Sequence, residues 1–168
     1  MFLLFINTVL TINLVLFQHA HSDYYICDSE PYREGSRHCI ACHEHPSHFE
    51  LINTGDGNLF IKSPINNSVF DVAKYKRDLI MVHENGGDNQ LYQIRYVNPI
   101  HAVIVNSYGK CVTFVPSTNT YELVGCMSNA YQLYKVVSDV GHDRHDFIPA
   151  IHDSYPQHNE DLINDSIV

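Results

Sequence analysis

The unit that decides the fold is residues 109–134, GKCVTFVPSTNTYELVGCMSNAYQLY, in which an early and a late cysteine precede a terminal aromatic residue. The same cysteine spacing occurs earlier in the chain. Cys27 and Cys111 are 84 residues apart, as are Cys42 and Cys126, which is two periods of 42. A fixed period of this length is typical of a repeat architecture. The spacing therefore predicts three copies of about 42 residues in one compact domain.

The middle copy keeps this period without its cysteines, because Val69 and Glu84 stand at the two cysteine positions. An aromatic marker ends each copy, at Phe49, Tyr92 and Tyr134. Between residues 49 and 137, short segments rich in β-branched and aromatic residues alternate with Gly, Asn, Asp, Pro and Ser. Such segments indicate strands joined by turns. The sequence predicts an all-β fold with about four short strands per repeat.

The two ends of the chain differ in composition from the middle. Residues 2–17 form an uncharged apolar run before Ala20-His21-Ser22, which is typical of a secretory signal peptide over residues 1–22, with an uncleaved anchor as the alternative. Residues 138–168 hold 7 acids and only Arg144, so we expect a disordered acidic, His-rich tail. A net charge of −9 without a basic stripe argues against nucleic-acid partners. We expect a secreted protein without a membrane span after cleavage.

Five cysteines in a secreted chain favour disulfides. Cys27 and Cys42 are 15 residues apart, as are Cys111 and Cys126, so each pair is expected to close a loop within its own repeat. Each closure stabilises the fold by about 3 kcal/mol in the chain-entropy model. Cys39 is left over. It is free, pairs with another chain, or competes with Cys42 for Cys27.

The segment Cys39-Ile40-Ala41-Cys42-His43 also fits the haem-attachment pattern, and its histidine-rich surroundings offer zinc or copper ligands. The repeat period already assigns Cys42 to a disulfide, and the strand-rich chain does not suit a small helical cytochrome. We therefore expect no cofactor and no metal. The sequence lacks a hydrolase elbow, a P-loop and a dinucleotide fingerprint, and an oxidised cysteine is no nucleophile. A non-enzymatic protein is expected.

Two segments, Asn89-Gln90-Leu91-Tyr92 and Tyr131-Gln132-Leu133-Tyr134, close their repeats alike. Together with Gly109-Lys110-Cys111 they resemble the ricin B-type β-trefoil lectin family, whose repeats end in Gln-x-Trp. The resemblance implies a β-trefoil over residues 23–137. Tyrosine replaces the tryptophan twice, and Phe49 with Ser47 replaces the motif in the first repeat. Because that aromatic residue mostly fills the core, the substitutions preserve the fold.

The resemblance also implies a sugar pocket in the middle repeat. Asp71, Asn89 and Gln90 stand at its polar positions, and His83 is the ring nearest the aromatic platform. A carboxylate and an amide can bind adjacent hydroxyls while a ring packs on the sugar. The alternative is that Asp71, Asn89 and Gln90 only satisfy backbone groups in turns. For a sugar site we expect Asp71→Ala to abolish glycan retention without lowering thermal stability.

The other repeats lack this set, with Thr113 and Tyr131 in the third and Ser29 and Pro46 in the first. Glycosylation sequons begin at Asn66 and Asn164. Two functions remain open. One is a secreted lectin-like protein with at most one weak site for a glycan or glycoprotein. The other is a scaffold that acts through protein contacts, as a cell- or spore-wall component or an inhibitor of a secreted enzyme, with Cys39 as a possible disulfide link to a partner.

Overall fold

The computed structural model describes residues 14–31, 37–73, 77–127 and 129–138. Four strands come from each of three successive segments, as the repeat predicts. The first segment gives β1 (Leu14–His19), β2 (Tyr25–Pro31), β3 (Arg37–Cys42) and β4 (Phe49–Asn53). The second gives β5 (Leu59–Lys62), β6 (Ser68–Val72), β7 (Leu79–His83) and β8 (Tyr92–Tyr96). The third gives β9 (Ala102–Asn106), β10 (Lys110–Val115), β11 (Thr120–Gly125) and β12 (Tyr134–Ser138). Single 3₁₀ turns precede β8 and β12, namely η2 (Asp88–Gln90) and η3 (Ala130–Gln132).

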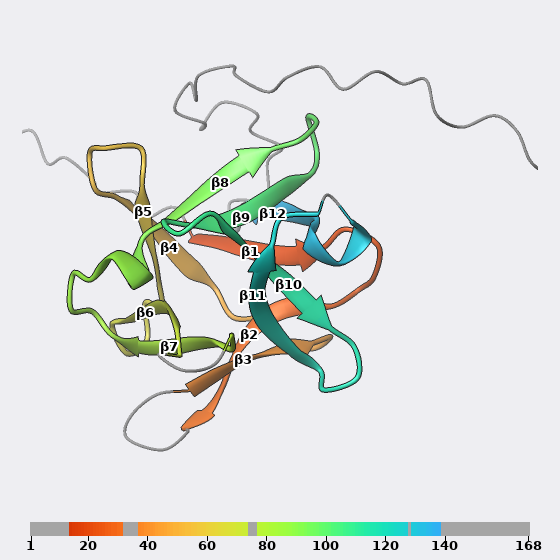
Figure 1. The fold of residues 1–168 in the computed structure, drawn as a ribbon. Helices are drawn as coiled ribbons and strands as arrows, with labels where there is room; N and C mark the ends of the chain where they lie inside the picture. Colours follow the sequence, from red (N-terminus) through yellow and green to blue (C-terminus); the bar gives the residue numbers. More distant parts are fainter. Residues whose placement is uncertain (1–13, 32–36, 74–76, 128, 139–168) are drawn as a thin grey trace, which may run out of the picture.

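The first and fourth strands of each segment together form a closed barrel. Each pairs antiparallel with two neighbours in the cyclic order β1, β4, β5, β8, β9, β12. The second and third strands of each segment form a hairpin, giving β2–β3, β6–β7 and β10–β11. These hairpins meet at one end of the barrel, where β3 pairs with both β7 and β11 (Figure 1). Closing the sheet leaves the barrel strands without a free edge.

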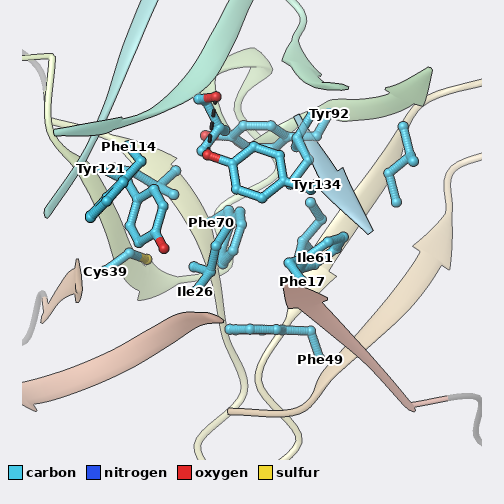
Figure 2. Close-up of a cluster of buried hydrophobic side chains, with 14 of the residues drawn as sticks. Phe17, Ile26, Cys39, Phe49, Ile61, Phe70, Tyr92, Phe114, Tyr121 and Tyr134 are labelled. Atoms are coloured by element: carbon cyan, nitrogen blue, oxygen red, sulfur yellow. Dashed lines mark hydrogen bonds between the residues drawn. The ribbon is translucent and has the colours of Figure 1, made fainter. Parts of the chain in front are cut away.

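The core is aromatic, and the three marker residues lie inside it. Phe49, Tyr92 and Tyr134 are all fully buried (Figure 2), so the prediction that they fill the core is confirmed. Phe70 packs edge-to-face against both Phe49 and Tyr92, with ring centroids 5.0 and 5.9 Å away. The Tyr134 hydroxyl donates a hydrogen bond to the Val112 carbonyl at 3.3 Å. Tyrosine thus replaces the larger tryptophan and keeps the core filled.

The barrel begins earlier than the sequence suggested, at Leu14 rather than at Asp23. Strand β1 lies within the predicted signal segment 1–22, yet it pairs with β12 over five residues and with β4 over two. Its Phe17 is fully buried in the core. A signal peptide ending at Ser22 would therefore include the first strand of the barrel. Residues 1–13, the tail 139–168 and its sequon at Asn164 lie outside the described residues, and their predicted roles remain predictions.

Both predicted disulfides are present, Cys27–Cys42 and Cys111–Cys126. Cys39 is free and fully buried in the core (Figure 2). Burial raises the pKa of its thiol well above the usual range, and only the thiolate exchanges with disulfides. The predicted disulfide link to a partner through Cys39 is therefore wrong for the folded protein. In the middle repeat, Glu84 at the cysteine position pairs with Lys62 at 3.1 Å.

Candidate functional site

The structure brings the predicted polar residues of the middle repeat together. Asp71 lies in β6, and Asn89 and Gln90 lie in η2. The Asn89 side-chain amide donates to one carboxylate oxygen of Asp71, and Gln90 Nε2 donates to the other at 2.9 Å. His83 lies at the end of β7, the hairpin partner of β6, and its backbone carbonyl accepts from Gln90 Nε2 at 3.1 Å. The three polar side chains thus form one cluster, and His83 contacts it only through its backbone carbonyl.

Gln90 is the inner member of this cluster. It is fully buried, and its Oε1 accepts from the Asn85 backbone N–H at 2.8 Å. The third repeat contains the same arrangement around Gln132, whose Nε2 donates to the Thr113 hydroxyl and to the Gly125 carbonyl, both at 2.9 Å. Because the arrangement recurs where the acidic residue is absent, we interpret Gln90 as a scaffold that fixes the loop, rather than as a ligand contact.

Exposure separates the remaining members. Asp71 is only 4% exposed, Asn89 is half-buried and His83 is exposed. A carboxylate has about four lone-pair sites, so Asp71 keeps acceptor capacity after its two bonds to the amides. His83 pairs with Ser68, three residues before Asp71 on β6, so its ring lies on the opposite face of the hairpin from Asp71 and the predicted platform role of His83 is wrong. A small polar ligand at this surface would meet Asn89 first and the rim of Asp71 beneath it.

Substitution of Asp71 also has a cost for the fold. Asp71→Ala would remove one of the two acceptors of the buried Gln90 amide and the acceptor of the Asn89 amide. An unsatisfied buried polar group costs about 1–3 kcal/mol. The expectation that Asp71→Ala leaves thermal stability unchanged is therefore not supported by this geometry. Asn89, which is less buried, is the cleaner position for a binding test.

No family model matches the sequence, and no curated protein matches it. Solved structures do match. The designed threefold-symmetric protein ThreeFoil is 15% identical, with a TM-score of 0.67 over 74% of this chain and 97% of its own. The BEL β-trefoil is 13% identical, with a TM-score of 0.62 over 75% of this chain and 92% of its own. The fold is a β-trefoil.

A lectin is also among the similar structures. The Polyporus squamosus lectin, bound to a sialylated human-type influenza-binding epitope, is 18% identical with a TM-score of 0.63. The match covers 73% of this chain and 48% of the lectin. At these identities the comparisons establish the trefoil fold alone, and the ricin B-type relationship remains a resemblance. Among the described residues, no helix is long and apolar enough to cross a membrane.

The third repeat of the trefoil presents a different surface at the equivalent positions. Tyr131 replaces Asn89 and is 48% exposed, and Met127 replaces Asn85 and is 64% exposed. Thr113 replaces Asp71, so this repeat has no carboxylate beside its scaffold amide. The prediction that only the middle repeat supplies the polar set agrees with this arrangement.

The first repeat contains a charged group that the sequence did not reveal. Asp28, the neighbour of Ser29, pairs with Arg37 at 2.8 Å, and Asn66 Nδ2 donates to its other carboxylate oxygen at 3.3 Å. Its backbone N–H donates to the Ser47 hydroxyl at 2.9 Å. The sequon residue Asn66 therefore faces the first repeat, across the interface between repeats. No local signal marks such a group, because its members come from three separate segments.

Proposed function

We propose that this protein is a non-enzymatic, extracellular trefoil that binds carbohydrate weakly through one site in the middle repeat. The observation that carries the proposal is the bond between partly exposed Asn89 and Asp71, in the one repeat with a carboxylate at that position. A fixed carboxylate and an amide suit recognition of vicinal hydroxyl groups. The two disulfides agree with an extracellular location.

The proposed site is small, with one carboxylate and one accessible amide. We expect weak affinity for a monosaccharide and stronger binding to a multivalent surface, where linked sites raise the effective concentration. A glycan or glycoprotein is the proposed partner.

Screening of the full disulfide-bonded chain on a broad glycan array tests this function. We expect binding to a restricted set of glycans and its loss in Asn89→Ala, because that change removes a partly exposed donor and acceptor. Tyr131→Ala, at the equivalent position of the third repeat, is the matched control and should bind like the wild type. Well-folded wild-type protein that binds no glycan on the array would contradict the proposal.

A second function, a scaffold for protein contacts, is favoured by a separate observation. Tyr131 and Met127 are exposed in the third repeat where the middle repeat has asparagines. Tyrosine and methionine are enriched in protein interfaces. If the array is negative, this surface becomes the leading candidate. Serine at both positions should then abolish co-purification with a partner recovered by the wild-type chain.

A further inference from the structure

Three histidines lie where the first and last strands of the barrel meet. His19 ends β1 and pairs with Tyr134, the first residue of β12, which in turn pairs with Ala102 of β9. His21 lies in the turn after β1, and His101 directly precedes β9. The ring centroids of His19 and His21 are 6.3 Å apart, and those of His21 and His101 are 6.1 Å apart. Imidazoles from two separate segments thus gather at the closure of the barrel.

His19 is the buried member of this histidine group, with 4% of its surface exposed. Its Nδ1 is 2.9 Å from the Ser22 hydroxyl. The ring packs against Phe114 at 5.5 Å, meets Tyr134 edge-on at 6.1 Å and stacks on exposed Tyr131 at 6.3 Å. The imidazole therefore serves as a neutral aromatic spacer that holds Tyr131 against the barrel.

The surroundings do not favour charge on these rings. Burial lowers the pKa of His19, with His21 adding to the effect and the Ala130 carbonyl opposing it. Partial burial, His21 and Lys135 of β12 lower the pKa of His101.

The other charged groups on the packed elements are few. Asp23 is exposed in the turn that holds His21. His43 contacts Tyr24, whose ring centroid lies 5.6 Å from that of Phe114. In the part of the chain that the structure describes, no carboxylate forms an ion pair with the three histidines. Protonation would therefore place like charges together beside Lys135.

We propose that this histidine group makes the closure of the barrel sensitive to acid. Protonation of the histidines weakens the packing of β1, β12 and the turn before β9 and releases Tyr131 from His19. The direction of the stability change follows from the linkage between protonation and folding. Because the pKa of His19 is lower in the folded than in the unfolded chain, its contribution to stability is complete above about pH 6.5 and is lost as the pH falls below it. The pKa of Asp28 is raised, mainly by burial, so Asp28 affects stability in the opposite direction. Its protonation therefore does not lower the stability of the fold on acidification.

Hydrogen exchange of the full disulfide-bonded chain at pH 7.5 and 5.5, corrected for intrinsic exchange, tests the proposed acid sensitivity of the barrel closure. We expect the protection of β1–β12 amides to fall relative to that of β6–β7 amides. The fall can reach about tenfold per pH unit for each proton taken up on opening. An equal change in both strand pairs, or no change in either, would overturn the proposal.

Variants assign the effect to the histidines. His19→Phe keeps an aromatic ring in an aromatic site and should abolish the selective loss of protection. His21→Gln, at an exposed position that should tolerate the change, removes the shared neighbour and should reduce the loss even if His19→Phe does not fold. His83→Gln on β7 is the matched control and should behave like the wild type. A full selective loss in His21→Gln would contradict the assignment.

Discussion

A chain that begins at Asp23 is expected to lose its cooperative unfolding transition. Such a chain lacks β1, which closes the barrel between β12 and β4. It also lacks Phe17, which is fully buried against Phe49 and Phe70 at ring distances of 5.8 and 6.2 Å. Both neighbouring strands would then expose unpaired edges and the core would open to water. Circular dichroism during urea titration measures the result.

Two comparisons sharpen this prediction. A chain that begins at Asn13 keeps the whole of β1 and should unfold cooperatively. In the full chain, Phe17→Ala should lower the free energy of unfolding by about 3–5 kcal/mol, the usual cost of such a truncation in a core. Leu16→Ala, at a half-buried position of the same strand, should cost less. A chain from Asp23 with the transition midpoint of the full chain would show that β1 does not belong to the fold.

This strand also constrains how a secreted form could be processed. Any cleavage that keeps the barrel intact must lie before Leu14, because the barrel pairing begins there. Sequencing the N-terminus of the secreted chain would check this expectation directly.

Alanine at Gln90 or at Gln132 is expected to lower the free energy of unfolding by similar amounts, about 3 kcal/mol each. Both side chains are fully buried. Each bonds two acceptors through Nε2 and one backbone N–H through Oε1. Truncation leaves these buried groups unsatisfied, at about 1–3 kcal/mol for each group that cannot be rehydrated. Urea denaturation of the two variants gives the comparison.

A surface glutamine provides the control for this pair. Gln93→Ala removes a half-buried side chain whose Nε2 donates to Asn58 at 2.9 Å and whose Oε1 accepts from Arg95 at 2.7 and 2.9 Å. Because water can reach these part-buried partners, the change should cost less than alanine at either buried glutamine. Gln132→Ala should also leave glycan binding unchanged. If only Gln90→Ala abolished binding while both glutamine variants kept wild-type stability, Gln90 would be a ligand contact and not a scaffold.

The repeat period was sufficient to predict much of this fold. It located the disulfides and the buried aromatic markers, because threefold symmetry fixes which positions share an environment. The family resemblance, rather than the period, pointed to Asp71, Asn89 and Gln90, and only the structure shows that Gln132 repeats the role of Gln90. The equivalence of the two glutamines was visible in the sequence, but their burial was not.

Two features could not be predicted, for physical reasons. Residues 14–17 of β1 belong to an apolar run that resembles a signal peptide, and the alternation of half-buried and buried side chains among them is hidden because all four are apolar. For Cys39 the sequence left three states open, namely a free thiol, a link to another chain or competition for Cys27, and the structure contains the buried free thiol. In a strand, residues three apart face opposite sides, so Cys42 in a disulfide on the outer face implies that Cys39 faces the core. The bond between Asn66 and Asp28 could not be predicted, since these two residues meet only through the packing of two repeats.

The most direct test of the proposed sugar site is the dissociation constant of the strongest array ligand, measured by chemical-shift titration of the full chain. Loss of a hydrogen bond between a ligand hydroxyl and a neutral amide costs about 0.5–1.5 kcal/mol, so Asn89→Ala should bind about two- to tenfold more weakly than the wild type. Tyr131→Ala, its counterpart in the third repeat, should bind like the wild type. Equal affinity of Asn89→Ala and the wild type would contradict a carbohydrate site in the middle repeat.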